Sequence, residues 1–101
     1  MVEKTITIRK RAGELTVDFN QVTLHKGRGD TVRWKTVPRN LNYLVCFGRR
    51  TPFKYRHYGK VRPGSGRIEV TPPVGRRMSF KYSIEVGDLL LDPVIIIRDG
   101  P

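Results

Sequence analysis

The chain has 101 residues, a length that suits one domain with a single core. Hydrophobic residues make up 38% of it and charged residues 29%, which is typical of a globular rather than a disordered chain, and no apolar run approaches the roughly 20 residues needed to span a bilayer. From this length and composition we expect one soluble domain over residues 1–101. The net charge of +11 favours anionic partners.

The first third of the chain contains short runs in which apolar and polar residues alternate, as they do in strands with one buried face. The apolar positions of these runs are Ile6 and Ile8, then Leu15, Val17 and Phe19, then Val22 and Leu24, and finally Val32 and Trp34. The segment "KGRGD" at 26–30 predicts a turn between the last two strands.

The middle of the chain is less regular. Residues 41–47 form a predicted strand that is apolar on both sides, and residues 68–70 a brief one. The best helix candidate lies within 49–60, where Pro52 and Gly59 limit it to a turn or two. The segment "RPGSG" at 62–66 predicts a flexible hairpin connection.

The last third holds the clearest pattern. In "MSFKYSIEV" at 78–86 every second residue is apolar, which predicts a strand with one buried face. The β-branched run at 94–97 predicts a strand covered on both faces, and "TPPVG" at 71–75 and "VGD" at 86–88 predict turns. Seven or eight short strands at this spacing indicate an all-β fold, namely an antiparallel β-sandwich with Greek-key connections.

Three segments carry a resemblance to a known family: "GDTVRWKT" at 29–36, "LVCF" at 44–47 and "FKYSIEVGDLLLDPVIII" at 80–97. In this order and separation they resemble the cupredoxin-like domains of the plastocyanin and azurin type. The resemblance covers roughly residues 14–98 and implies a two-sheet sandwich whose core is filled by Trp34 and the 80–86 face.

The copper site of that family does not carry over. Blue-copper sites take two imidazoles, a thiolate and a weak axial ligand. In the family, one histidine follows the tryptophan strand and the other ligands come from the last loop. Here the corresponding stretches "KTVPRNLNYLVCF" and "VGDLLLDP" contain no histidine in the first and no cysteine, histidine or methionine in the second. We therefore expect no cofactor and no bound metal.

The remaining soft side chains favour structural roles. Cys46 lies within a predicted strand, His25 ends one, and His57 sits in a basic stretch. Together with Met78 they leave a copper-binding electron-transfer protein with an unconventional site as an alternative. Asp88 and Asp92 fall in turns, so the chain offers no nucleophile and base or carboxylate pair, and we expect no enzyme.

The positive charge is concentrated in the middle of the chain. Residues 26–81 contain fifteen Lys or Arg against two acidic residues, and 49–66 forms a basic connecting loop with six cations and three aromatic rings. A contiguous basic surface that binds an anionic partner is expected from the following residues: Arg33, Lys35, Arg39, Arg49, Arg50, Lys54, Tyr55, Arg56, Tyr58, Lys60, Arg62, Arg76 and Arg77.

Two kinds of partner fit this surface. The first is an acidic face of a larger protein assembly, or an anionic membrane surface, with the chain as an accessory subunit. The alternative is nucleic acid bound without sequence preference, with Tyr55 and Tyr58 stacking on bases. In the first case Phe53 and Tyr55 would instead anchor the loop to the core. The N-terminus alternates apolar and polar residues unlike an export signal, which favours a cytoplasmic location.

Overall fold

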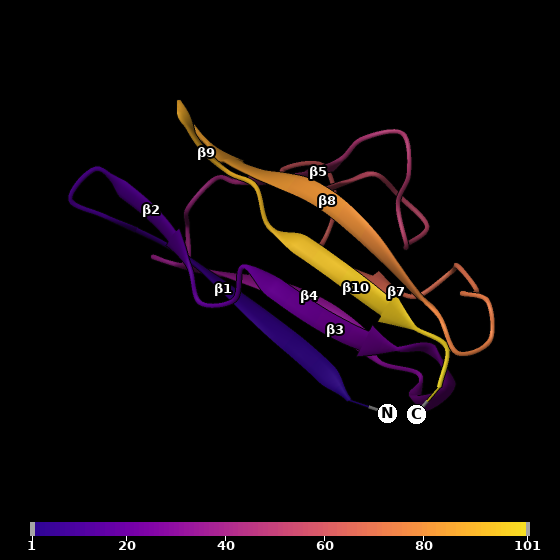
Figure 1. Ribbon diagram of the computed structural model, residues 1–101. Helices are drawn as coiled ribbons and strands as arrows, with labels where there is room; N and C mark the ends of the chain where they lie inside the picture. Colours follow the sequence, from indigo (N-terminus) through magenta and orange to yellow (C-terminus); the bar gives the residue numbers. More distant parts are fainter. Residues whose placement is uncertain (1, 101) are drawn as a thin grey trace.

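Strands dominate the computed structural model, which describes residues 2–100 (Figure 1). A single short 3-10 turn, η1 (Lys26–Arg28), is the only helical element within these residues. The strands are β1 (Glu3–Arg11), β2 (Glu14–Val17), β3 (Gln21–His25), β4 (Thr31–Val37), β5 (Leu44–Phe47), β6 (His57–Gly59), β7 (Ser65–Arg67), β8 (Arg77–Val86), β9 (Leu89–Leu91) and β10 (Val94–Arg98).

The strands form two mixed sheets. One has the order β2-β1-β4-β7, and the other has the order β3-β10-β8-β5-β6 with β9 paired to β8. Most neighbouring strands are antiparallel, but β1 runs parallel to β4 and β10 runs parallel to β3. The fold is thus all-β and compatible with a β-sandwich, whereas the expectation of purely antiparallel sheets is wrong. A one-sided apolar strand pattern is the same in both directions, so the sequence does not reveal this.

The core lies where the inward residues of both sheets meet. Alternate residues of β1 and β4 point inward from the first sheet, and the even-numbered residues 80–86 of β8 point inward from the second. They belong to one buried cluster together with Ile95 and Ile97 of β10. The charged residues of β4 and β8 therefore lie on the outer faces, whereas in β10 the consecutive residues Ile95, Ile96 and Ile97 are all buried, as predicted for a strand covered on both faces.

Five aromatic rings fill one end of this core. The Trp34 ring lies 5.4 Å from the Tyr58 ring and 5.8 Å from the Tyr82 ring, measured between centroids. Phe47 stacks on Tyr82 at 4.8 Å and meets Phe53 edge to face at 5.6 Å. The prediction that Trp34 and the 80–86 face fill the core is confirmed.

Several predicted elements differ from the structure. No helix forms in 49–60; β6 occupies its end instead. The brief strand lies at Ser65–Arg67 rather than at 68–70, and the first of the middle strands begins at Leu44 rather than at 41. The segment "GSGR" reads as a flexible connection because glycine lacks a side chain to pack, yet Gly66 pairs with Val32 in the β4–β7 ladder.

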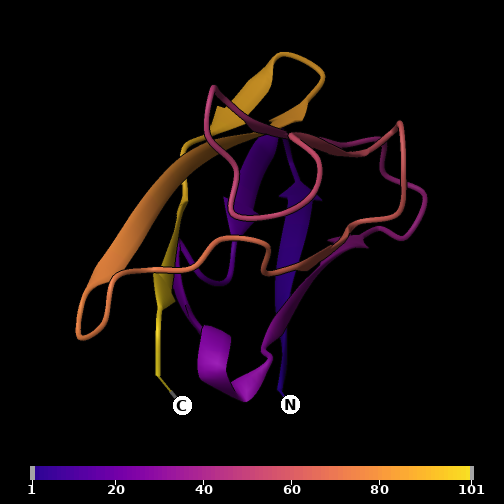
Figure 2. The same cartoon turned by 90° about the vertical axis from the view of Figure 1, so that its right-hand side faces the viewer.

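The connection from β5 to β7 is the longest in the chain. Figure 2 shows it running as wide loops beside the strands. The short β6 lies within this connection. β6 pairs with β5, and β7 pairs with β4, so this connection crosses from the second sheet to the first. The basic loop predicted at 49–66 therefore bridges the two sheets.

Candidate basic docking surface

Phe53 fixes the basic loop to the core. Its side chain is buried, and its ring packs edge to face against Trp34 with 6.0 Å between centroids. The ring also lies against Gly66 of β7, where an added Cβ would come within 2.9 Å of it. Glu69 donates its backbone N–H to the Pro52 carbonyl at 2.8 Å, which ties the loop to the segment after β7. The expectation that Phe53 anchors the loop is confirmed.

The two tyrosines of the loop have different environments. Tyr58 is only 3% exposed because its ring packs on Trp34, so it offers no open face to a ligand. Its hydroxyl accepts the Tyr55 backbone N–H at 3.2 Å. Tyr55 itself is 42% exposed. Tyr55 therefore does not anchor the loop to the core, contrary to the prediction. Tyr58, which was expected at the binding surface, is buried and holds Tyr55 through this hydrogen bond.

Arg62 lies flat over the exposed tyrosine. Its guanidinium carbon is 3.9 Å from the centroid of the Tyr55 ring, and one of its terminal nitrogens, Nη1, donates to the His57 carbonyl at 2.9 Å. The Lys54 ammonium is 5.4 Å from the same ring. Stacking and one hydrogen bond hold the guanidinium in place, so its other N–H groups are oriented before any partner arrives.

A shallow groove of about 580 Å³ opens beside this stack. Three cations line it from two segments that are not adjacent in sequence, and one carboxylate lies at its margin. Its lining residues are Lys54, Tyr55, Tyr58, Arg62, Pro63, Ser65, Arg67 and Glu69, and we call it the Tyr55 groove.

Arg67 joins the Tyr55 groove to the outer face of the first sheet. It pairs with Thr31 while Arg33 pairs with Ser65, so Arg33 and Arg67 are diagonal neighbours on one face. Lys35, two residues along β4, extends the row. Arg67 is not among the residues predicted for the surface, although it belongs to the basic residues of 26–81; only the β4–β7 register shows that it lies beside Arg33.

The other predicted cations lie at separate places. Arg39 lines a depression with Lys35 and Tyr43, and the Arg50 guanidinium lies 5.3 Å from the Phe80 ring centroid. Arg49, Arg56 and Lys60 are exposed on the loop. Arg76 and Arg77 line a depression with Arg98 instead of the Tyr55 groove. The predicted cations therefore line at least three different depressions.

Carboxylates neutralise few of these charges. Across residues 2–100, cationic groups lie within 4.0 Å of a carboxylate oxygen in two pairs, Arg28–Asp30 at 2.8 Å and Arg33–Glu3 at 3.7 Å. The second pair is exposed at both ends and long, so it contributes little. The cations of the Tyr55 groove have no such partner in this part of the chain, and their field is open to an external anion.

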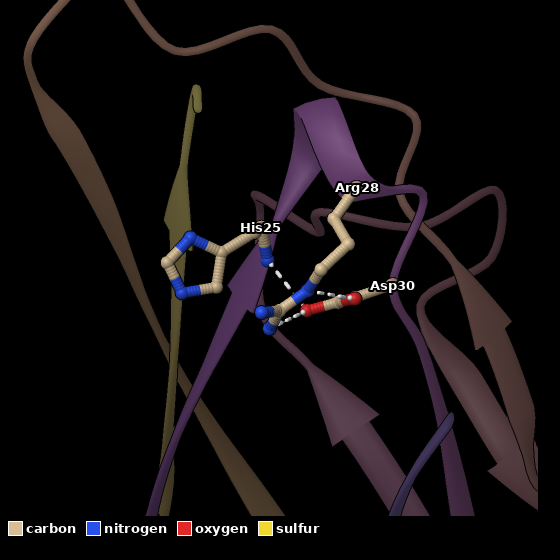
Figure 3. A network of polar contacts seen from close by, with 3 residues as sticks. All are labelled: His25, Arg28 and Asp30. Atoms are coloured by element: carbon tan, nitrogen blue, oxygen red, sulfur yellow. Dashed lines mark hydrogen bonds and ion pairs between the residues drawn. The ribbon is translucent and has the colours of Figure 1, made fainter. Parts of the chain in front are cut away.

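The Arg28–Asp30 pair is structural. Figure 3 shows the Asp30 carboxylate held between the Arg28 guanidinium and the His25 backbone. The two Arg28 bonds measure 2.9 and 2.8 Å, and the His25 N–H donates at 3.0 Å. The hydrogen bonds from Arg28 lower the pKa of Asp30 to about 2, against the effect of burial, which raises it. Asp30 thereby closes the turn between β3 and β4.

Among residues 2–100, no three His, Cys, Asp or Glu side chains come together as a group that would hold a metal ion. Cys46 is a half-buried free thiol in β5, as its strand position predicted. In the same part of the chain, none of the helical structure is long and apolar enough to cross a membrane.

The sequence matches no protein-family model and no curated protein sequence.

Proposed function

We propose that this chain is a copper-free, cupredoxin-like binding module that acts without catalysis. It docks as an accessory subunit onto an acidic face of a larger protein assembly, with the Tyr55 groove and the adjoining Arg33 and Lys35 as its contact surface. The shared core of the two sheets around Trp34 supports the fold part of this proposal.

One observation carries the docking part. The Arg62 guanidinium is held over Tyr55 and by the His57 carbonyl, while no carboxylate within the described chain pairs with it. A guanidinium held in this way loses little conformational entropy when it binds a carboxylate with its remaining donors. Lys54 and Arg67 flank it in the same groove and extend the contact.

The aromatic residues favour a protein partner over single-stranded nucleic acid. Base stacking needs open ring faces, and Phe53 and Tyr58 are each 3% exposed. Arg62 covers one face of the Tyr55 ring. The cations can still attract a phosphate backbone, but only one face of the Tyr55 ring is left for stacking on a base.

Titration of the chain with a glutamate-rich peptide and with a single-stranded oligonucleotide of equal charge tests this proposal. We expect tighter binding of the peptide, and an Arg62→Gln variant that binds it about tenfold more weakly, because hydrogen bonds between charged groups contribute about 1.5–3 kcal/mol each. Lys81→Gln, which removes an exposed cation from the second sheet, is the matched control and should bind as the wild type does.

Tighter binding of the oligonucleotide, with a loss in Tyr55→Ala larger than in Arg62→Gln, would establish the nucleic-acid alternative instead. Equal losses in Arg62→Gln and Lys81→Gln would show that the groove has no special role. Capture of partners from native extract, with and without nuclease, then separates the two classes of partner in the cell.

A further inference from the structure

A second cationic cluster lies on the outer face of the other sheet. Arg77, the first residue of β8, is directly opposite Arg98, the last residue of β10, in the antiparallel ladder. Both point away from the core, because their ladder neighbours Met78 and Ile97 point towards it. The register therefore places two exposed guanidinium groups side by side, which is an unfavourable pairing for like charges.

A third arginine completes the cluster. Arg76 comes from the turn before β8 and lines one depression of about 510 Å³ together with Gly75, Arg77 and Arg98. The nearby carboxylate of Asp99 accepts the Gly75 backbone N–H at 2.8 Å and lies within 4.0 Å of none of the three guanidinium groups. That bond fixes the turn and holds Arg76 and Arg77 beside Arg98.

We propose that this cluster binds a phosphate monoester dianion. Three guanidinium groups around one depression supply more planar donor pairs than a single carboxylate can accept, whereas a tetrahedral dianion offers three equivalent oxygens to them. A doubly charged ligand also relieves the repulsion between Arg77 and Arg98. The site draws on neither the Tyr55 groove nor the function proposed for it, since no residue lines both depressions.

The turn suggests where the phosphate comes from. Val74 at its tip is 95% exposed and precedes Arg76 and Arg77 closely in the sequence. An exposed apolar tip next to cations suits a lipid phosphate at a bilayer surface, and the arginines alone suit a free phosphate or a soluble phosphomonoester. The bound chemistry is the same in both cases, so the experiment has one arm for each source.

In the first arm, inorganic phosphate is titrated at constant ionic strength while the amide resonances of residues 75–77 and 98 are followed. We expect saturating shifts, and an apparent Kd raised about tenfold or more by either Arg77→Gln or Arg98→Gln, because charged hydrogen bonds are lost. Arg77→Lys keeps the charge and loses the planar fork, so its Kd should lie between those of the wild type and Arg77→Gln. Arg9→Gln, which removes an exposed cation from β1 of the first sheet, is the control and should leave the Kd unchanged.

In the second arm, the chain is mixed with phosphatidylcholine vesicles with and without phosphatidic acid. Binding that requires phosphatidic acid and is lost in both Arg98→Gln and Val74→Ser identifies a lipid source, and phosphate binding without vesicle binding identifies a soluble one. Shifts that stay linear up to about 10 mM phosphate, or an equal loss in Arg9→Gln, would overturn the proposal. Neither result changes the peptide binding expected for Arg62→Gln in the docking test, so the two proposals can fail independently.

Discussion

Asp30 shows how much one buried charge contributes to this fold. Its side chain is fully buried, yet three hydrogen bonds from Arg28 and His25 replace its hydration. These hydrogen bonds to the carboxylate fix the turn that separates β3 from β4. The sequence segment "RGD" gives no sign of this role, because burial of an aspartate depends on the neighbouring strands rather than on its local sequence.

The lowered pKa of Asp30 predicts an acid-sensitive part of the stability. A group whose pKa is lower in the folded state stabilises above its unfolded value of 3.8 and loses that contribution as the pH falls towards about 2. We expect Asp30→Asn to reduce the free energy of unfolding at neutral pH by about 1–2 kcal/mol, a value discounted because Arg28 is partly exposed and screened. Urea unfolding of both proteins across this pH range measures it.

The difference in unfolding free energy between the wild type and Asp30→Asn should become smaller as the pH falls from about 4 to about 2, because the wild-type carboxyl then takes up a proton. Other carboxylates titrate in both proteins and cancel in the comparison. A gap that stays constant over this range would contradict the assignment of the lowered pKa to Asp30.

At the level of elements, the regular strands could be predicted and the irregular ones could not. The alternation of residues 78–86 predicts β8 and its buried face, and the apolar run at 94–97 predicts β10. β6 and β7 were missed because each has three residues and contains glycine, so no apolar period is visible. Their pairing partners, β5 and β4, decide their conformation.

Gly66 is the point where β7 depends on the absence of a side chain. A Cβ there would come within 2.9 Å of the Phe53 ring, which itself is wedged against Trp34 and Phe47. We expect Gly66→Ala to cost about 1–3 kcal/mol of unfolding free energy, as overpacking does in close-packed cores. Chemical unfolding followed by Trp34 fluorescence measures it.

Gly48 provides the control for this substitution. A Cβ at Gly48 has no heavy atom within 4 Å, and its backbone does not adopt a positive φ. Gly48→Ala should therefore change the stability by no more than about 0.5 kcal/mol. If both substitutions lower the free energy of unfolding by the same amount, the contact between Gly66 and Phe53 does not hold the basic loop.

For the whole molecule, the sequence predicts the charge but not how the cations group. The excess of Lys and Arg in residues 26–81 is plain in the sequence, and so is the basic loop. Grouping requires the register: β7 beside β4 brings Arg67 next to Arg33, and β10 beside β8 brings Arg98 next to Arg77. The register therefore divides what reads as one continuous set into at least two groups of neighbouring cations.

This grouping predicts that the position of charge matters more than its total. Two triple variants, one replacing Lys54, Arg62 and Arg67 by Gln and the other Arg9, Lys10 and Lys81, lower the net charge of +11 by the same three charges. The first set lines the Tyr55 groove, and the second lies exposed on β1 and β8. We expect the first variant to bind a glutamate-rich peptide at least about a hundredfold more weakly, from two or more lost charged contacts.

The salt dependence of binding distinguishes direct contacts in the Tyr55 groove from attraction to the net charge. Direct contacts release counterions, so the slope of log K against log salt should become shallower in the groove variant by about the number of contacts removed and stay unchanged in the other. If attraction to the net charge were the whole cause, both variants would weaken equally at low salt and converge with the wild type at high salt. Titrations at three or more salt concentrations, with circular dichroism to verify that both variants fold, therefore decide whether the Tyr55 groove is a site or part of a diffuse field.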